Sequence, residues 1–432
     1  MKNINELLIE LESLPTGYIS KKNIHGKDYF YLQYKNNGKL VSKYIKEDDL
    51  EKLKEELKRR EEIEKEIKSL LAKEKNLNSL SKTTLELSGY VMEEDRVVAE
   101  FDKGVLVSID NDNAPLIIKR THDLISFLSS RILDTSRTNA RLLKRIMNVH
   151  AEEEYLIALK NHATSVTDNY WFRSKNSRLK YKDVSLESDI YNEVSLKGEL
   201  LYFPKEAKLS PQFSLLGSYE KCWRLINNEW WMYKSETKEE MYSELIASKI
   251  SDLLNIPTAF YEIDGDYIRT KNFATKNNFE PISSIAGDND SFEHIFNLLL
   301  NLDKELAKQY LKIIYFDALT NNIDRHNENL GFLRDKKNGR IVSLAPNFDL
   351  NMSLFARNTL LRKTKDGFIS LFIRFVETHD EVRELFKETN IPSLKETVVD
   401  TILSQYDLSE WNLDIKGYLL YRENILRKTC NL

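Results

Sequence analysis

The chain has 432 residues, of which 41% are hydrophobic and 31% charged, and its formal net charge is −4. This length allows two or three domains with at least one large core, and the charge argues against a protein whose main task is to coat nucleic acid. Two cysteines, Cys222 and Cys430, exclude a disulfide framework and a cysteine-based zinc site and favour a reducing compartment. Because the N-terminal apolar stretch is interrupted by glutamates, we expect no secretory signal. We find no apolar run of about 18 residues that would predict a membrane span, so we expect a cytoplasmic protein.

Residues 17–46 are rich in Tyr, Phe, Ile and Val, and Asn37-Gly38 is a strong hairpin signal. We predict an antiparallel sheet of two or three strands, and we assign residues 1–46 to a small β module. From Glu47 to about Lys75, leucine and isoleucine recur at helical spacing among dense Glu and Lys. The heptad is broken, which favours one solvated helix over a coiled coil. Residues 76–84 are polar, so 47–85 are expected to be a charged helix and linker.

The β module carries seven lysines in residues 17–46 against one acidic residue, Asp28, and tyrosines lie between them. Such a surface could bind nucleic acid. The alternative, which we prefer, is the solvated face of a small sheet whose lysines discourage edge-to-edge pairing.

Residues 86–198 form a mixed segment. Tyr90–Ile118 are expected to contain short strands and Thr121–Val149 helices.

The next region contains a glycine-containing loop, a strand and a helix. Residues 210–224 contain neither GxGxxG nor a Walker A motif, but backbone amides and small hydroxyls around Gly217 could lie over phosphates. The alternative is a simple turn between strands. Glu229–Lys234 reads as a strand, and an amphipathic helix follows, which Pro257 should stop.

The residues with the clearest chemistry lie between Asn321 and Ser353. Asp303 is a suitable N-cap for a helix that should end near Asn321-Asn322. Residues 330–334 and 340–344 read as two strands joined through Asn338-Gly339. Because a hairpin brings its ends together, Asn329 and Asp349 should return to the same place.

Phosphoryl transfer needs such a cluster, since it depends on metal ions and positioning. Asn329 and Asp349 supply the hard oxygen ligands that magnesium prefers. Asp324 could orient the attacking hydroxyl and accept its proton, while Arg325 and His326 could favour ionised Asp324 or contact phosphate. The alternative is a polar loop followed by an ordinary hairpin.

The segment IDRHNENLGF (323–332) resembles the catalytic loop shared by HipA-like kinases and phosphoinositide kinases, and APNFDL (345–350) resembles their metal-binding segment. The resemblance implies that Asp324 is the catalytic aspartate and that Asn329 and Asp349 are magnesium ligands. His326 matches the histidine of the motif.

The nucleotide side is similar to the same family. Ser214, Gly217 and Ser218 belong to a segment like the HipA-type Ser-x-x-Gly loop that leads into a lysine, here Lys221. The resemblance implies that Lys234 contacts ATP. Its expected ion-pair partner is Glu244, with Glu240 as the fallback.

The resemblance implies an α+β, two-lobed, protein-kinase-like fold, with residues 199–290 as the N-lobe and 291–432 as a mostly helical C-lobe. It also implies an ATP- and Mg²⁺-dependent kinase acting on Ser or Thr of a protein, with toxin-like growth or phage-defence control and autophosphorylation at Ser214. Alternatives are a lipid or small-molecule kinase and a DNA-associated regulatory protein with a degenerate kinase fold. Expected partners are the protein substrate and an antitoxin-like regulator. Nucleic acid bound through residues 17–46 stays open, and we expect no membrane association.

Overall fold

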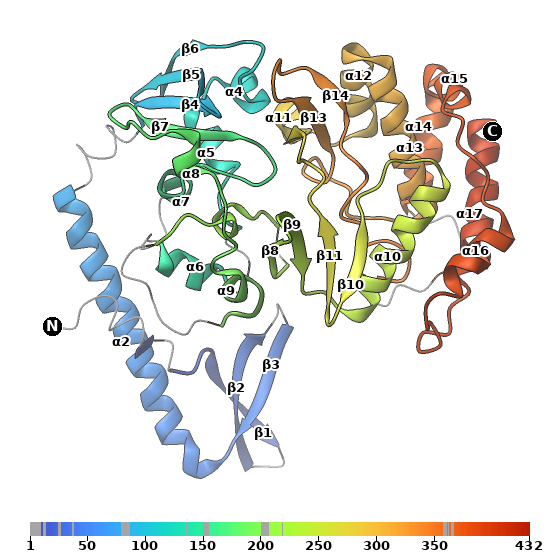
Figure 1. The fold of residues 1–432 in the computed structure, drawn as a ribbon. Coiled ribbons are helices and arrows are strands. Elements are labelled where there is room, and N and C mark those ends of the chain that lie inside the picture. The colour runs from blue at the N-terminus through green and yellow to red at the C-terminus, as the bar shows by residue number, and fades with distance from the viewer. Residues whose placement is uncertain are drawn as a thin grey trace. The chain divides into compact units, whose positions relative to one another are not determined.

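The computed structural model describes residues 10–432 except 12–13, 25–26, 37–38, 79–86, 135–136, 138, 148, 150–154, 200–206, 218, 357–360, 362 and 364–366. The chain divides into two compact units, Met1–Leu85 and Glu86–Leu432. The ribbon in Figure 1 gives the element labels.

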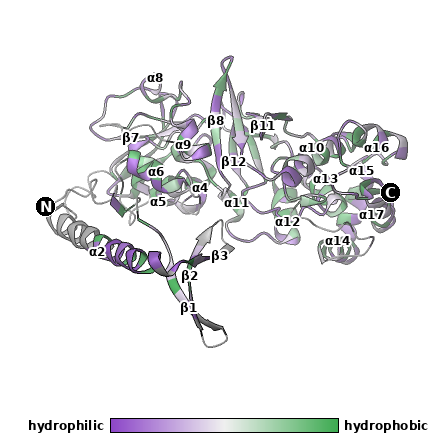
Figure 2. Ribbon diagram, turned by 90° about the horizontal axis from the view of Figure 1, so that it is seen from below, coloured by the Kyte–Doolittle hydropathy of each residue, from purple (hydrophilic) through white to green (hydrophobic). Residues whose placement is uncertain are grey.

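The first unit is a three-stranded antiparallel sheet followed by one long helix. Its elements are β1 (Tyr18–Ile24), β2 (Lys27–Asn36), β3 (Lys39–Ile45) and α2 (Glu47–Asn78). The predicted strands and charged helix are therefore confirmed, while the predicted Asn37-Gly38 turn lies outside the described residues. Ile45, Leu50 and Ile63 are buried. The part of α2 that is coloured in Figure 2 is mostly hydrophilic, as its Glu- and Lys-rich sequence requires.

The second unit begins with a four-stranded antiparallel sheet in the order β6-β5-β4-β7. Its strands are β4 (Gly89–Glu93), β5 (Arg96–Asp102), β6 (Val105–Ile109) and β7 (Tyr170–Ser174). Short helices accompany it, namely α4 (Leu116–Thr121), α5 (Leu124–Ser129), α6 (Ala140–Ile146), α7 (Tyr155–Lys160), α8 (Tyr181–Val184), α9 (Asn192–Lys197) and the 3₁₀ turn η1 (Pro211–Ser214). The expected strands and helices are present, although residues 116–118 are helical rather than extended.

A second antiparallel sheet has the order β10-β11-β9-β8 and carries one long helix. Its elements are β8 (Lys221–Ile226), β9 (Glu229–Lys234), α10 (Lys238–Leu253), β10 (Tyr261–Asp264) and β11 (Tyr267–Lys271). Thr237 caps α10 by accepting a hydrogen bond from the Glu240 backbone N–H. In Figure 1 this sheet stands between the β4–β7 sheet and the C-terminal helices.

The remaining part is mostly helical, with one small sheet in the order β12-β13-β14. It contains β12 (Asn277–Pro281), α11 (Ser283–Ala286), α12 (Phe292–Leu302), α13 (Lys304–Thr320), β13 (Gly331–Asp335), β14 (Ile341–Leu344), α14 (Gly367–Thr378), α15 (Asp380–Glu388), α16 (Glu396–Leu403) and α17 (Ile415–Cys430). The largest hydrophobic cluster is built around α13, whose Ile314, Phe316 and Leu319 are fully buried. This sheet-then-helix organisation is the expected two-lobed α+β fold.

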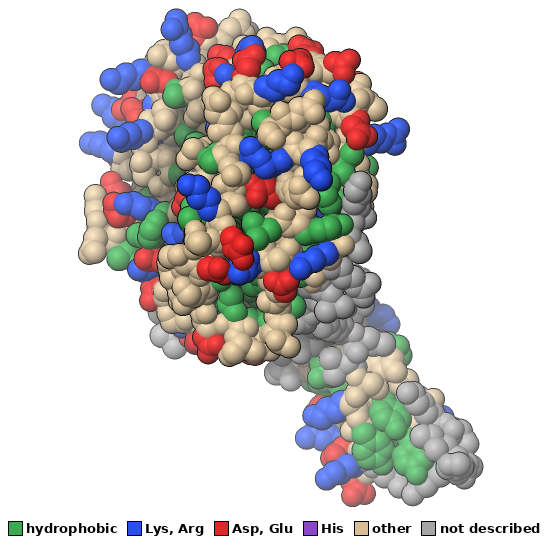
Figure 3. Space-filling view, turned by 90° about the vertical axis from the view of Figure 1, so that its right-hand side faces the viewer, with side chains coloured by type: hydrophobic (Ala, Val, Ile, Leu, Met, Phe, Trp, Pro, Cys, Tyr) green, Lys and Arg blue, Asp and Glu red, His purple; other side chains and the backbone are tan. Residues whose placement is uncertain are grey.

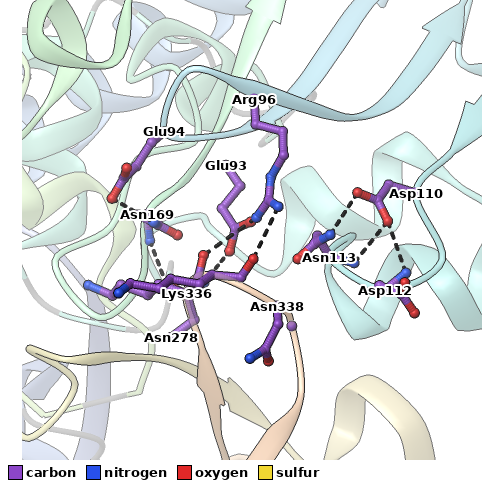
Figure 4. A network of polar contacts seen from close by, with 12 residues as sticks. Glu93, Glu94, Arg96, Asp110, Asp112, Asn113, Asn169, Asn278, Lys336 and Asn338 are labelled. Carbon is purple, nitrogen blue, oxygen red and sulfur yellow. Dashed lines mark hydrogen bonds and ion pairs between the residues drawn. The ribbon is translucent and has the colours of Figure 1, made fainter.

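The hairpin β13–β14 is tied to the β4–β7 sheet by polar contacts (Figure 4). Arg96 in β5 donates to the backbone carbonyl oxygens of Lys337 at 3.3 Å and Lys336 at 3.4 Å, at the hairpin tip. Asn278 in β12 donates to Glu93 Oε1 at 3.0 Å. The two sheets therefore hold one another through side-chain contacts that are distant in sequence.

Candidate nucleotide and phosphotransfer site

Helix α13 directly precedes the candidate catalytic loop. Asp303 caps it by accepting from the Glu305 N–H at 2.7 Å, as predicted, and Asn321 ends it in the left-handed conformation with φ 56°. Asp324 and His326 then lie exposed in the loop, while Asn329 is buried. Asn329 Nδ2 donates to the Asp324 backbone carbonyl at 3.0 Å. The amide is thereby fixed by the loop itself.

Arg325 connects the loop to the segment after β14. Its guanidinium donates to both carboxylate oxygens of the fully buried Asp317, at 2.8 and 2.9 Å. It also donates to the backbone carbonyl oxygens of Asn329 at 2.7 Å and Phe348 at 3.1 Å. The expected return of Asn329 and Asp349 to one place is thus achieved by a buried arginine. The Arg325 side chain is turned inward to Asp317, and its action on Asp324 or phosphate stays a prediction.

Asp349 is strained at its backbone and charged at its side chain. Its φ of 57° lies in the left-handed region, which costs a residue with a Cβ about 1–2 kcal/mol. The Tyr261 hydroxyl accepts from the Asp349 N–H at 2.9 Å and holds this conformation. Burial opposes ionisation of the carboxyl, but the Lys234 and Lys221 ammonium groups outweigh it and hold the pKa of Asp349 at about 2.

Lys234 is the centre of the charged cluster. Its Nζ lies 2.9 and 3.1 Å from the two carboxylate oxygens of Glu244 and 2.7 Å from Asp349 Oδ1. The expected ion pair with Glu244 is present, and Glu240 is not its substitute. Glu240 instead accepts from the Thr237 N–H at 3.0 Å and the Tyr219 hydroxyl at 2.7 Å. Burial opposes the charge on Lys234, yet Asp349 and Glu244 raise its pKa well above the usual value.

The glycine-containing loop lies beside this cluster through Lys221. Lys221 in β8 is directly opposite Lys234 in β9. Gly217 has φ 90°, which favours glycine, and a Cβ there would lie 2.5 Å from Lys221 Nζ, so the end of that lysine side chain would have to shift. Burial lowers the pKa of Lys221 to about 8. Ser214 ends η1 with its hydroxyl donating to the Pro211 carbonyl at 3.2 Å, and Ser218 lies outside the described residues.

The sequence pattern did not identify several residues of this cluster. Tyr261, Glu236 and Asp317 belong to no motif. The sequence motif includes Lys221 only as the lysine that follows the Ser-x-x-Gly loop. Cross-strand alignment of Lys221 with Lys234 could have been anticipated from a correctly registered hairpin. The burial of Glu236 and Asp317 depends on tertiary contacts that leave no local signal.

A metal ion bound at this cluster would have few protein ligands. Within the described residues, no group of three or more His, Cys, Asp or Glu side chains is arranged to hold a metal. Magnesium in phosphotransfer sites, however, takes one or two protein ligands and completes its shell with phosphates and water. An ionised, 24% exposed Asp349 and the carboxamide oxygen of Asn329 fit that smaller requirement.

The sequence matches two family models. Residues 266–406 match the HipA-like C-terminal domain, and residues 2–59 match a domain of unknown function, DUF6788. The first match contains Asp324, His326, Asn329 and Asp349, whereas Lys234 and Glu244 precede it. No curated protein sequence matches the chain.

Two solved structures are similar at low identity. The Helicobacter pylori proinflammatory kinase CtkA has 16% identity and a TM-score of 0.37, over 48% of this chain and 90% of that one. HipA of Shewanella oneidensis MR-1, in a toxin–antitoxin complex with HipB and operator DNA, has 15% identity and a TM-score of 0.45, over 80% of this chain and 100% of that one.

Proposed function

We propose that this chain, in which residues 266–406 match the HipA-like C-terminal domain, is an ATP- and Mg²⁺-dependent kinase that transfers the γ-phosphate to Ser or Thr of a protein. The observation that carries the proposal is the cluster around Lys234. One ammonium group bridges Glu244 and Asp349, and Arg325 joins the segment that bears Asp349 to the loop of Asp324 and Asn329.

Each residue has a defined task in this proposal. Glu244 orients Lys234 toward the nucleotide phosphates, and Lys221 adds a second positive charge beside Gly217. Asn329 and Asp349 would hold the magnesium ion, which neutralises charge on the phosphates when bound. The exposed Asp324 carboxylate accepts the proton of the substrate hydroxyl while the hydroxyl oxygen attacks the γ-phosphorus of ATP. The bond between that phosphorus and the β–γ bridging oxygen breaks, and ADP leaves. His326 belongs to the same loop as Asp324 and Asn329.

The test is phosphotransfer by the full chain with γ-labelled ATP and magnesium, scored on protein, lipid and small-molecule fractions. We expect label on Ser or Thr of protein, and loss of at least about 100-fold in Asp324→Asn. Glu328→Gln, which changes an exposed carboxylate in the same loop, serves as the matched control. Label in lipid or a small molecule would favour the second candidate, a phosphoinositide-type or small-molecule kinase, which the Asp-Arg-His-x-x-Asn loop also suits. Absence of ATP turnover would favour a regulatory protein with a degenerate kinase fold.

Ser214 is the proposed site of autophosphorylation. A phosphate there would add about −1.5 to −2 charges beside the glycine-containing loop and repel nucleotide. Because the hydroxyl now donates to Pro211, modification requires the η1 turn to release it. This regulation would suit a toxin-like kinase.

Partners are proposed at the level of chemistry. A protein substrate is required, and an antitoxin-like regulator follows from the growth-control role. On the first unit, Tyr44 is exposed and its ring lies 5.7 Å from Tyr31 and 6.2 Å from Tyr29. Exposed aromatic rings among lysines could stack on nucleic acid. On the face of the second unit seen in Figure 3, basic and acidic side chains are interspersed instead. Among the helices of the described residues, none is long and apolar enough to cross a membrane.

A further inference from the structure

Four of the five tyrosines in the strands of the first unit lie on one face of its sheet. Successive residues of a strand point to opposite faces, so the strand register assigns each position to a face. Tyr18 of β1 is aligned with Gln33 of β2. Tyr31 and Tyr29 occupy the preceding alternate positions of β2, and Tyr44 of β3 is aligned with Tyr31. The side of the sheet that bears these four residues is called the tyrosine face.

The tyrosine face presents aromatic rings to solvent. Tyr18 is 57% exposed and Tyr44 is 52% exposed. The ring centroid of Tyr44 lies 5.7 Å from that of Tyr31 and 6.2 Å from that of Tyr29, so two half-buried rings support it. Side chains of the hydrophobic class, which includes tyrosine, are visible on the surface of the first unit in Figure 3. A solvated face explains the lysines of this sheet but not a group of exposed aromatic rings, which is typical of a binding surface.

The charge of this sheet is strongly positive. Residues 17–46 contain seven lysines and one aspartate, a net charge of +6 with histidine neutral, whereas the whole chain has −4. Asp28 belongs by register to the opposite face, and its carboxylate lies 2.7 Å from Lys21 Nζ. Among the strand positions of the tyrosine face that the structure describes, none is acidic, whereas Lys22 and Lys35 belong to it by register. An anionic partner therefore suits this face.

Nucleic acid fits this combination of residues better than a protein partner does. Protein interfaces are enriched in aromatic residues but depleted in lysine. Surfaces that bind single-stranded nucleic acid combine basic residues along the phosphate backbone with aromatic rings on which bases stack. In a duplex the base faces already stack on one another, so exposed rings select the single strand.

The polar groups of the tyrosine face favour DNA over RNA. RNA recognition uses contacts to the ribose 2′-hydroxyl. The Tyr18 hydroxyl already donates to Gln33 Oε1 at 2.5 Å, and the Ser20 hydroxyl donates to the Tyr31 carbonyl at 3.4 Å. Both hydroxyls are thus engaged within the sheet, and deoxyribose needs no such partner.

We propose that the tyrosine face binds single-stranded DNA, with separate bases stacked on Tyr18 and Tyr44 and lysine ammonium groups at the phosphates. The two tyrosines lie on the outer strands with β2 between them, so about 10 Å of sheet separates their backbones. The inference rests on the nucleic-acid partner of the proposed function and on none of its phosphotransfer residues. It gives the first unit a role that needs no nucleotide at the kinase site.

The experiment is fluorescence anisotropy of a labelled oligo-dU of about 20 nucleotides, longer than the roughly 4–16 nucleotides that one single-strand-binding fold covers, titrated with the full chain. The competitors are unlabelled oligo-dU, its duplex with oligo-dA, oligo-rU and polyglutamate. We expect unlabelled oligo-dU to displace the label best. Tyr18→Leu and Tyr44→Leu should each weaken binding by about 5- to 150-fold, whereas Tyr18→Phe and Tyr44→Phe keep the ring and the affinity.

Two lysine variants separate phosphate contacts on this face from general attraction to a basic protein. Lys22→Gln should lower the slope of log Kd against log salt concentration by about 0.7, as the loss of one phosphate contact requires. Lys52→Gln, which changes an exposed lysine of α2, is the matched control and should leave that slope unchanged. Thermal unfolding identifies any variant that no longer folds, and the other tyrosine position then decides the question.

Several results would overturn the inference. These are no binding of oligo-dU by the folded chain, equal affinity for the duplex, equal or tighter affinity for oligo-rU, and unchanged affinity in the folded leucine variants. Displacement by polyglutamate as effective as that by oligo-dU would indicate an acidic protein partner instead. Phosphotransfer is measured in parallel: a chain that transfers phosphate but does not bind oligo-dU refutes this inference alone, while one that binds oligo-dU without turnover of ATP refutes only the kinase.

Discussion

Replacing Arg325 by methionine should destabilise the second unit strongly, because it leaves the carboxylate of Asp317 buried without its ionic partner. Asp317 is 0% exposed and its arginine partner 6%. Breaking a buried ion pair by removing one partner typically costs about 3–5 kcal/mol. Three further hydrogen bonds, to Asn329 O, Phe348 O and Asn347 Oδ1, are lost with it, although such terms are not additive. The Asn322 amide still donates to Asp317 at 2.9 Å, so we expect the lower half of that range, about 3–4 kcal/mol.

Thermal unfolding with a double-mutant cycle measures this effect. At roughly 2–4 °C per kcal/mol for a large domain, Arg325→Met should lower Tm by at least about 6 °C. The double variant Arg325→Met/Asp317→Leu should lose less than the sum of the single changes, since it removes the stranded carboxylate. Arg325→Lys is the control that keeps the charge but not the paired geometry. Its Tm should lie between those of wild type and Arg325→Met. A Tm of Arg325→Met within about a degree of wild type, or strictly additive losses in the double variant, would refute the reasoning.

Three further predictions concern the proposed kinase site. Asp349→Asn should weaken binding of ATP with magnesium as well as turnover, whereas Asp324→Asn should leave binding nearly intact and slow phosphotransfer by about 10²- to 10⁴-fold; equal losses of binding in calorimetry would contradict this division. Peptide mass spectrometry after incubation with ATP should find phosphate on Ser214, and Ser214→Ala should keep an activity that wild type loses with time; modification elsewhere would remove the proposed regulation. A chain that begins near Lys82 should still be stabilised thermally by ATP and magnesium, because every nucleotide-site residue follows position 209; a folded chain without that shift would show that the first unit takes part.

The elements that sequence predicted best are those set by local chemistry. Asp303 caps α13, and a glycine with φ 66° at position 339 closes the turn between β13 and β14. These depend on side-chain to backbone hydrogen bonds and on allowed dihedral angles within a few residues. The ion pair between Lys234 and Glu244 was expected from the resemblance to HipA-like kinases, which left Glu240 as the fallback partner.

What the sequence could not predict depends on contacts between distant segments. Arg325 was expected to face Asp324 or phosphate because it lies between Asp324 and His326 in the motif. Its actual partner, Asp317, lies one helix turn before the end of α13, where the only sign of burial is a run of apolar neighbours. Glu236 similarly reads as a solvated acid between strand and helix. It is buried because the segment 349–351 packs over it, more than a hundred residues later.

A second buried arginine, Arg334, holds the hairpin that connects the two proposed magnesium ligands. Arg334 lies in the hairpin between Asn329 and Asp349, is 0% exposed, and pairs with Glu280 of β12. It also donates to Ala114 O at 3.0 Å, Asp112 O at 2.7 Å and the Tyr170 hydroxyl at 3.1 Å. The hairpin is therefore held at its ends by Arg325 and at its tip by Arg334. Residues from the β4–β7 part are partners of that tip, so this segment helps to fix the positions of Asn329 and Asp349 although it contributes none of the proposed site residues.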